Sequence, residues 1–179
     1  MAKKLIIDFL GVNLIARKTF FSDQGSFSIT HNPDLTPGIA FYQDSISILK
    51  NKNTLKGMHL QAGKYSQAKL VTVLQGGIID FFVDLRKDSE SYLDYGCIEI
   101  DKGNANMLFI PRGFAHGYIT TAPNTMVSYK LDAPYAPEHE LTMLWNDSKI
   151  NIEWPKTDDL HISSKDLNGL SFYEVEKKL

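Results

Sequence analysis

Short apolar segments separated by turn residues fill the middle of the chain, and no other feature restricts the fold as strongly. Residues 70–74 are apolar and largely β-branched, the sequence Gln75-Gly76-Gly77 supplies a turn in which glycine can take a positive φ, and residues 78–85 are apolar again. This pattern predicts a β-hairpin. Further strands are predicted at residues 96–100, 106–110, 118–121 and 125–132. Short strands at such even spacing favour a β-sandwich or β-barrel over alternating strands and helices.

The flanking segments indicate loops, short strands and a short helix rather than a second domain. Residues 23–25 and 31–38 are rich in turn residues and adjoin short strands. Ser163 is placed to cap a helix whose first turn contains Asp166. The 179 residues show no internal repeat, low-complexity segment or linker, and their number suits one domain. We therefore expect a single all-β domain over residues 1–179, with short flanking helices.

Composition and charge exclude several classes of function. Hydrophobic residues make up 43% and charged residues 22% of the chain, the balance of an ordinary soluble globular protein. A formal net charge of -2 gives no overall attraction to nucleic acid or to an anionic membrane, and the apolar runs are too short to span a bilayer. Asp8 interrupts the first apolar stretch too early for a signal peptide, so a cytoplasmic location is expected. The single cysteine, Cys97, excludes a disulfide framework and is expected to be a buried structural thiol.

Two histidines stand in strand-and-turn contexts that suit a pocket in such a barrel. The string Pro111-Arg112-Gly113-Phe114-Ala115-His116 is similar to the second motif of cupins, small β-barrels whose histidines often bind a metal. Metal-binding cupins have a His-x-His pair in the first motif, whereas here His59 is followed by Gln61. Two imidazoles are too few for a divalent transition metal, so a metal site is disfavoured and no cofactor is expected. An imidazole that binds no metal suits a general base near neutral pH, provided that a carboxylate fixes its tautomer.

A series of strings spread over the chain points to one family. In order these are Gly57-Met58-His59-Leu60-Gln61, Lys69-Leu70-Val71, residues 80–86, residues 110–117, Tyr129-Lys130, Tyr135-Ala136-Pro137-Glu138, and Trp145-Asn146-Asp147 leading to Trp154-Pro155. Their order and separations together resemble the dTDP-4-dehydrorhamnose 3,5-epimerase family. The resemblance implies a cupin-type jelly-roll β-barrel, usually a homodimer. It also implies a nucleoside-diphosphate-linked 4-keto sugar as substrate, in the synthesis of sugars for cell-surface polysaccharide.

The reaction of that family removes a proton from a carbon beside the C4 ketone and returns one on the opposite face. The resemblance implies that His59 is the base and that Asp166 orients it. Lys69 would stabilise the enolate oxygen, and Tyr129 would be the acid that protonates from the other side. This set is chemically coherent, because a lysine cation in a dry site can stabilise an enolate without a metal, and inversion needs groups on two faces. The presence of Tyr129 favours inversion at both C3 and C5.

The same resemblance supplies candidate substrate-binding residues. These are Gln24, Phe27, Gln43, Ser45, Lys56, Gln61, His116 and Tyr135. His116 and Tyr135 would line the pocket for the sugar and the nucleotide. Gln24 and Lys56 stand where the family usually has arginine, and Ser45 where it usually has asparagine, at positions that hold the diphosphate and the base. Lysine neutralises a phosphate but lacks the bidentate fork of arginine. We therefore expect the reaction to be kept, while the nucleotide (dTDP, GDP or CDP) and the sugar (hexose or heptose) stay open.

Structural roles and other classes of function compete with this interpretation. Taken singly, Lys69 suits an exposed edge strand, Asp166 a helix first turn, and Tyr129 a buried tyrosine bonded to backbone. One rival class is a metal-dependent cupin isomerase or oxygenase, which elemental analysis would identify. The other is a non-catalytic module that binds sugar nucleotides, in which His59→Asn would change nothing measurable.

Overall fold

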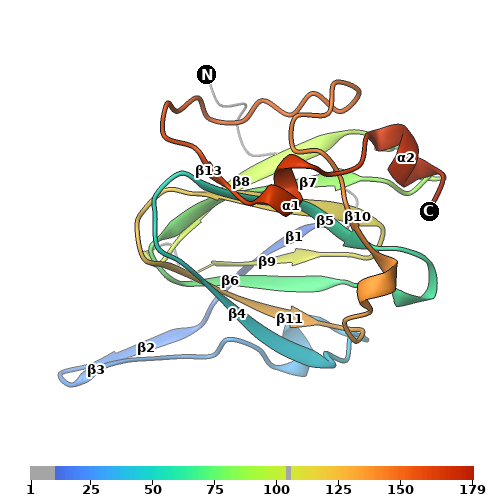
Figure 1. Ribbon diagram of the computed structural model, residues 1–179. Helices are drawn as coiled ribbons and strands as arrows, with labels where there is room; N and C mark the ends of the chain where they lie inside the picture. The colour runs from blue at the N-terminus through green and yellow to red at the C-terminus, as the bar shows by residue number, and fades with distance from the viewer. Residues whose placement is uncertain (1–10, 104–105) are drawn as a thin grey trace.

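The computed structural model describes residues 11–103 and 106–179, and its centre is a pair of β-sheets packed face to face (Figure 1). The first sheet is antiparallel throughout, with five strands in the order β1-β9-β6-β11-β4. Their bounds are Asn13–Ala16 for β1, Asn106–Ile110 for β9, Lys69–Gln75 for β6, Thr125–Leu131 for β11 and Gln43–Leu49 for β4. Half-buried and exposed residues alternate along β4, as expected for an edge strand with one face to the interior and one to solvent.

The second sheet follows the order β12-β5-β10-β7-β8, with the short strand β13 added parallel to β5. Its strands are β12 (Glu140–Thr142), β5 (Thr54–Gln61), β10 (Phe114–Thr120), β7 (Gly77–Asp84), β8 (Tyr95–Asp101) and β13 (His161–Ile162). β10 is buried along its whole length, because it lies between β5 and β7 with both faces covered. The expected all-β sandwich is therefore confirmed.

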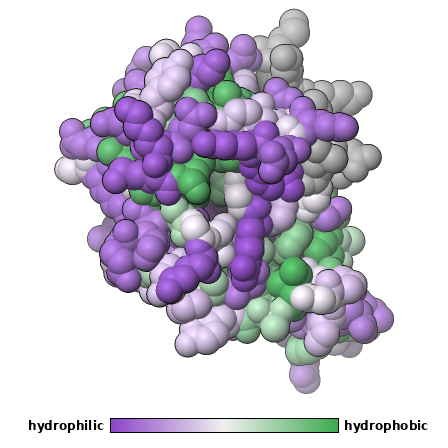
Figure 2. All heavy atoms as spheres, turned by 90° about the vertical axis from the view of Figure 1, so that its right-hand side faces the viewer, coloured by the Kyte–Doolittle hydropathy of each residue, from purple (hydrophilic) through white to green (hydrophobic). Residues whose placement is uncertain are grey.

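Two hydrophobic clusters lie on the two faces of the second sheet. Phe82 points between the sheets and packs in one cluster with Val71 of β6. Phe81, the preceding residue, points to the opposite face and packs in another cluster with Phe172 of the C-terminal segment. The segment from β12 to the C-terminus thus packs on the outside of this sheet (Figure 1). The face of the molecule in Figure 2 is mostly hydrophilic with smaller hydrophobic patches, as expected when the cores are inside.

The helices are short, as the sequence predicts. They are α1 (Ser164–Leu167) and α2 (Phe172–Glu176), and single 3-10 turns cover Pro33–Leu35, Gly63–Tyr65 and Pro137–His139. Ser163 caps α1, because its Oγ accepts a 3.1 Å hydrogen bond from the N–H of Asp166. Within the two described stretches, no helix has the length and apolar character needed to cross a membrane.

A two-stranded hairpin projects from the body of the molecule (Figure 1). It consists of β2 (Thr19–Ser22) and β3 (Gly25–Ser28), joined by the turn that the sequence predicts around residues 23–25. Phe21 is 83% exposed and Phe27 is 68% exposed on this hairpin. Large apolar side chains at that exposure are unusual on a monomer surface when they gather on one element.

The hairpin predicted across Gln75-Gly76-Gly77 is wrong. β6 and β7 are consecutive but belong to different sheets, β6 pairing with β9 and β11 and β7 with β8 and β10. Gly76 has a φ of +74°, and a Cβ there would lie 2.4 Å from Oγ1 of Thr125, so only glycine fits this corner between the sheets. The glycines do mark a turn, but a local pattern does not say which strands pair.

Two smaller differences concern strand bounds and the cysteine. The strand predicted at residues 118–121 begins earlier, at Phe114, and β4 and β5 lie outside the predicted strands. Cys97 on β8 is half-buried rather than buried. Burial still raises the pKa of its thiol, which keeps it protonated and unreactive near neutral pH.

Candidate active site

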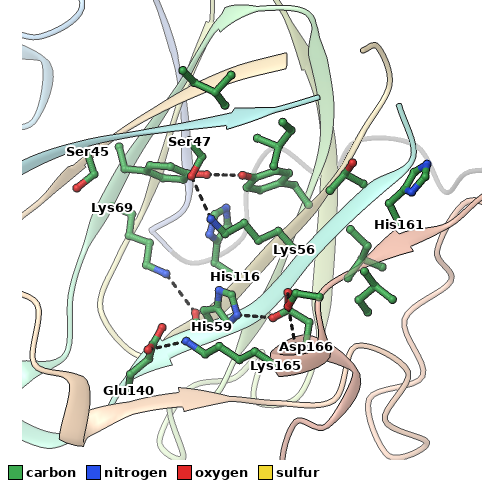
Figure 3. Close-up of a pocket in the computed structure, with 18 of the residues that line it drawn as sticks. Ser45, Ser47, Lys56, His59, Lys69, His116, Glu140, His161, Lys165 and Asp166 are labelled. Atoms are coloured by element: carbon green, nitrogen blue, oxygen red, sulfur yellow. Dashed lines mark hydrogen bonds and ion pairs between the residues drawn. The ribbon is translucent and has the colours of Figure 1, made fainter. Parts of the chain in front are cut away.

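A cavity of about 840 Å³ lies between the two sheets. Its walls come from β4, β6 and β11 of the first sheet, from β5 and β10 of the second, and from α1 (Figure 3). Nine of the twelve candidate residues line it, namely Gln43, Ser45, Lys56, His59, Lys69, His116, Tyr129, Tyr135 and Asp166. The fold thus brings together most of the site residues that the sequence predicts.

His59 on β5 is paired with Asp166 on α1. The His59 Nε2 and the Asp166 Oδ1 are 2.6 Å apart, and Oδ2 accepts a 2.8 Å hydrogen bond from Ser163 Oγ. Burial acts to raise the pKa of Asp166, but hydrogen bonds from His59, Ser163 and the Gly57 main chain outweigh it and lower that pKa. An ionised carboxylate only accepts, so Nε2 carries the proton and Nδ1 is left as the basic nitrogen.

Lys69 enters the cavity from β6, a strand in the middle of the first sheet rather than at its edge. Its Nζ donates a 3.1 Å hydrogen bond to the main-chain oxygen of His59, so the cation lies beside the histidine (Figure 3). Burial lowers the pKa of Lys69 to about 8, although Asp80 and Glu140 favour the charged form. The exposed edge lysine, the structural explanation considered for this residue, is therefore excluded.

His116 on β10 lies opposite His59 in the register of the two strands. Its Nε2 is 2.8 Å from Oδ2 of Asp80, and both side chains are buried, His116 at 5% and Asp80 at 0% exposure. Burial lowers the pKa of His116 and raises that of Asp80, because desolvation disfavours each charged form. His116 thus lines the cavity with its side chain held in place by Asp80.

Tyr129 approaches from the opposite side of the cavity to His59. It belongs to β11 of the first sheet, whereas His59 belongs to β5 of the second. The Tyr129 hydroxyl donates a 2.6 Å hydrogen bond to that of Tyr118, and its ring centroid is 6.5 Å from that of His116. The cavity therefore has an imidazole on the side of the second sheet and a phenol on the side of the first. The Tyr129 hydroxyl bonds to another side chain and not to backbone.

Metal ligands are the remaining chemical question at this site. Across residues 11–103 and 106–179, no three His, Cys, Asp or Glu side chains are grouped so that they could hold a metal ion. The cations nearest the cavity are lysines.

The sequence and the fold match one known family. The profile of the dTDP-4-dehydrorhamnose 3,5-epimerase family matches residues 7–174. This chain belongs to that family. The dTDP-4-dehydrorhamnose 3,5-epimerase of Escherichia coli strain K12 is 35% identical over 160 residues, which cover 87% of this chain and 86% of the relative. The enzyme of that name from Methanothermobacter thermautotrophicus is 36% identical over 164 residues, 88% of each chain.

Solved structures of family members have the same fold. The Bacillus anthracis dTDP-4-dehydrorhamnose 3,5-epimerase, crystallised with TDP and PPi bound, matches with a TM-score of 0.87 at 33% identity, over 96% of this chain and 99% of that one. The Legionella pneumophila epimerase in complex with dTDP-4-keto-L-rhamnose matches with a TM-score of 0.83 at 29% identity, over 88% and 86% of the two chains. The expected cupin-type jelly roll is confirmed.

An ion pair closes one side of the cavity in this family member. Lys165 Nζ and Glu140 Oε2 are 2.6 Å apart (Figure 3). The hydroxyl of Tyr135 donates to the same oxygen over 2.8 Å. Burial acts to raise the pKa of Glu140, but these two partners outweigh it and lower the pKa. Tyr135 itself is 52% exposed, so its ring is available to a ligand at the rim.

A row of polar groups follows the edge strand β4 and its neighbour β5. Gln43 Nε2 donates to Ser45 Oγ over 3.0 Å, and Gln43 Oε1 accepts a 3.3 Å hydrogen bond from the N–H of Tyr135. Farther along, Lys56 Nζ donates to Ser47 Oγ over 3.0 Å (Figure 3). Since side chains alternate along a strand, Gln43, Ser45 and Ser47 share one face.

Three candidate residues do not reach this cavity. Gln61 is 5% exposed, and its amide bonds only to backbone, with Nε2 donating to the oxygens of Tyr65 and Pro134 and Oε1 accepting from the N–H of Ala136. Two loops therefore cover Gln61. The prediction that it contacts the substrate is wrong, because its amide holds these loops in place. Gln24 and Phe27 lie on the β2–β3 hairpin and line a separate surface hollow.

Of the fifteen other residues that line the cavity, four contact the candidate side chains or one another and were not expected from the sequence. They are Ser47, Tyr118, Glu140 and Lys165. Ser47 could have been predicted from the sequence, because it continues the alternate positions of Gln43 and Ser45. Lys165 directly precedes Asp166 but carried no signal of its own. Tyr118 was assigned only to a strand, and its contact with Tyr129 depends on the pairing of the two sheets.

Proposed function

We propose that this protein inverts the two carbons beside the C4 ketone of a dTDP-linked 4-keto-6-deoxy sugar, C3 and C5. The observation that carries the proposal is the placement of His59, paired with Asp166, and of Tyr129 on opposite sheets of one cavity. The relatives named above are dTDP-4-dehydrorhamnose 3,5-epimerases, which supports this reaction. We place the reaction in the supply of sugars for cell-surface polysaccharide.

The reaction needs three actions from this chain. His59 takes the proton through Nδ1, because Asp166 holds the proton of Nε2. The electron pair moves into the ketone, and the ammonium of Lys69 stabilises the enolate oxygen. The enolate carbon then takes a proton from Tyr129 on the other face, which inverts it. Repetition at the second carbon completes the double inversion.

We propose that the reaction needs no metal, since a lysine cation in a desolvated site can carry the charge of the enolate oxygen. A metal-dependent isomerase is the alternative. Full activity after dialysis against a chelator, with no stoichiometric metal in elemental analysis, is the expected result. Loss of activity that added metal restores would contradict it.

The nucleotide is proposed to lie along the outer part of the cavity. Gln43, Ser45 and Lys56 all line the cavity, and Tyr135 offers an exposed ring on which a base can stack. Lys56 supplies one positive charge for a diphosphate. In a thermal-shift panel of dTDP, GDP, CDP and UDP we expect dTDP to raise the melting temperature most, because a ligand that binds only the folded state stabilises it according to its affinity.

Solvent deuterium tests the chemistry directly. Incubation of the dTDP-4-keto-6-deoxy sugar in deuterated water should label both C3 and C5 of the inverted product. His59→Asn should lower this exchange by about a hundredfold or more while nucleotide binding is retained. Deuterium at only one of the two carbons would mean that the protein epimerises a single centre. If His59→Asn exchanged as fast as the unaltered protein, His59 would not be the base, and a module that only binds the sugar nucleotide would be the better explanation.

We also propose that the protein is a homodimer. Gln24 and Phe27 are far from this chain's own cavity, on a hairpin that projects from the body, so they can contact a substrate only in a second copy. The exposed phenylalanines of the hairpin support burial against such a copy.

A further inference from the structure

Tyr118 lies directly behind Tyr129, the proposed acid. Their hydroxyl oxygens are 2.6 Å apart, and their rings stack with centroids 6.5 Å apart and planes at 28°. Tyr118 is 2% exposed, whereas Tyr129 is half-buried. Tyr129 is therefore the phenol with open access to a bound sugar, and Tyr118 acts on the cavity mainly through it.

Ser47 connects this phenol pair to a cation. Its hydroxyl lies near both phenols, where it acts to lower the pKa of Tyr118 and of Tyr129 against the larger effect of burial. On its other side it accepts the 3.0 Å hydrogen bond from Lys56 Nζ (Figure 3). Lys56 is half-buried at the cavity wall, so groups with exchangeable protons lie in a row from Tyr129 by way of Ser47 to a group in contact with solvent.

The acid needs such a chain because each inversion removes its proton. Burial raises the pKa of Tyr118 to about 12 and raises that of Tyr129 well above its ordinary value, so both phenols are protonated at neutral pH. A desolvated phenolate without hydrogen-bond donors would be costly to form. Burial also lowers the pKa of Lys56, which makes its ammonium a readier proton donor.

Resting on the proposed role of Tyr129 as the acid, we propose that Tyr118 is a positioning residue that works with Ser47 to hold the Tyr129 oxygen and to return its proton from Lys56. In the resting state Tyr129 donates to Tyr118. When the O–H bond of Tyr129 breaks and a C–H bond forms at the enolate carbon, the Tyr118 hydroxyl rotates and donates to the new phenolate. A proton then passes from the Lys56 ammonium through the Ser47 hydroxyl to that oxygen. His59 releases the proton it took to solvent, and the neutral amine of Lys56 takes one up from solvent, so the cycle balances.

Packing alone is the simpler explanation of Tyr118. A buried tyrosine normally finds a hydrogen-bond partner, and phenylalanine would fill nearly the same space without needing one. The two explanations differ in the step that they affect. A packing role predicts that loss of the hydroxyl affects all steps alike, whereas the relay predicts a loss confined to protonation from the Tyr129 face.

The experiment separates proton abstraction from inversion in Tyr118→Phe. With the dTDP-4-keto-6-deoxy sugar in deuterated water, deuterium in recovered, uninverted substrate reports abstraction by His59, and the inverted product reports delivery by Tyr129. We expect exchange and KM to stay within about twofold of the unaltered protein, while inversion falls by about ten- to a hundredfold. In Tyr129→Phe the rate of inversion should fall further still, while exchange into the uninverted substrate is again retained.

Two further variants keep the result decisive. Ser47→Ala interrupts the chain on its other arm and should give the same shift from inversion to exchange, even if Tyr118→Phe fails to fold. Tyr92→Phe removes a phenol that bonds Glu176 on the far side of the second sheet, and should leave both rates unchanged.

Three results in the Tyr118→Phe and Ser47→Ala variants would contradict the relay. An unchanged ratio of inversion to exchange, a parallel fall of both, or a change in KM alone would overturn the relay. If the unaltered protein neither exchanges nor inverts the sugar, the proposed function fails, and the relay fails with it.

Discussion

Lys69 combines a desolvated position with a neutral hydrogen-bond partner. Its ammonium donates to the main-chain oxygen of His59, and burial lowers its pKa to about 8. In the proposed reaction only the charged form of Lys69 can stabilise the enolate oxygen, so this charge is close to being lost at physiological pH. A small rise in pH therefore acts on the chemistry long before surface lysines lose their protons.

The alkaline side of the pH profile tests this residue. Lys69 is charged below its pKa and neutral above it, so kcat/KM should fall above pH 8, approaching about tenfold per pH unit. Lys69→Arg keeps the charge at all these pH values and should remove the alkaline limb, at the cost of a lower maximum rate. The measurement is kcat/KM for epimerisation from pH 6 to 10. An identical alkaline limb in Lys69→Arg would assign it to another group.

The sequence predicted the position of some site residues correctly and of others wrongly. Motif similarity placed His59, Lys69, Tyr129 and Asp166 in one cavity, because groups that share one reaction must converge. It failed for Gln61, whose amide is occupied by the backbone of two loops. Motif position alone does not reveal such contacts, since they depend on where the loops close.

The corner between β6 and β7 decides how the two sheets are connected. Gly76 turns the chain there with a positive φ, and the Thr125 side chain and backbone occupy the space of a Cβ. The strands on either side could be predicted from apolar pattern, because local sequence determines which segments can be extended. Their pairing could not, since β6 pairs with β11 and β9 and not with its neighbour in sequence.

A pair of alanine variants separates strain from collision at this corner. Gly38 has a φ of +77° with no atom within 4 Å of a Cβ, so Gly38→Ala should cost only the left-handed conformation, about 1–2 kcal/mol. Gly76→Ala has the same strain at φ +74° and a contact of 2.4 Å with Thr125 Oγ1 besides, so its loss should be larger by about 1–3 kcal/mol. Urea unfolding gives both free energies. Equal losses in the two variants would mean that the corner relaxes freely.

The projecting hairpin bears on the assembly of the whole molecule. It carries Phe27 and Gln24 away from the cavity, and its length leaves apolar rings in solvent. The edge strand β4 adds Ile46 at 59% and Ile48 at 66% exposure. Surfaces of this kind are stable in water when a second copy covers them.

Substitution on the hairpin tests the dimer. Phe27→Asp places a charge in the proposed contact and should weaken dimerisation by about tenfold or more, as measured by light scattering over a dilution series. Tyr173→Asp is the matched control, because Tyr173 is also exposed, at 58%, but lies on α2. A monomeric unaltered protein, or equal weakening in both variants, would contradict the proposed interface.

Because the proposed acid and base lie on separate sheets, activity depends on the folding of the whole domain. His59 and Asp166 are 107 positions apart in sequence, and Tyr129 lines the same cavity from the other sheet. The half with His59 and Asp166 lacks Tyr129, and the half with Tyr129 lacks that pair, so neither half alone holds all the groups of the proposed reaction. Epimerisation therefore reports the completed native state, and during refolding it should return only with the last and slowest phase of sheet docking.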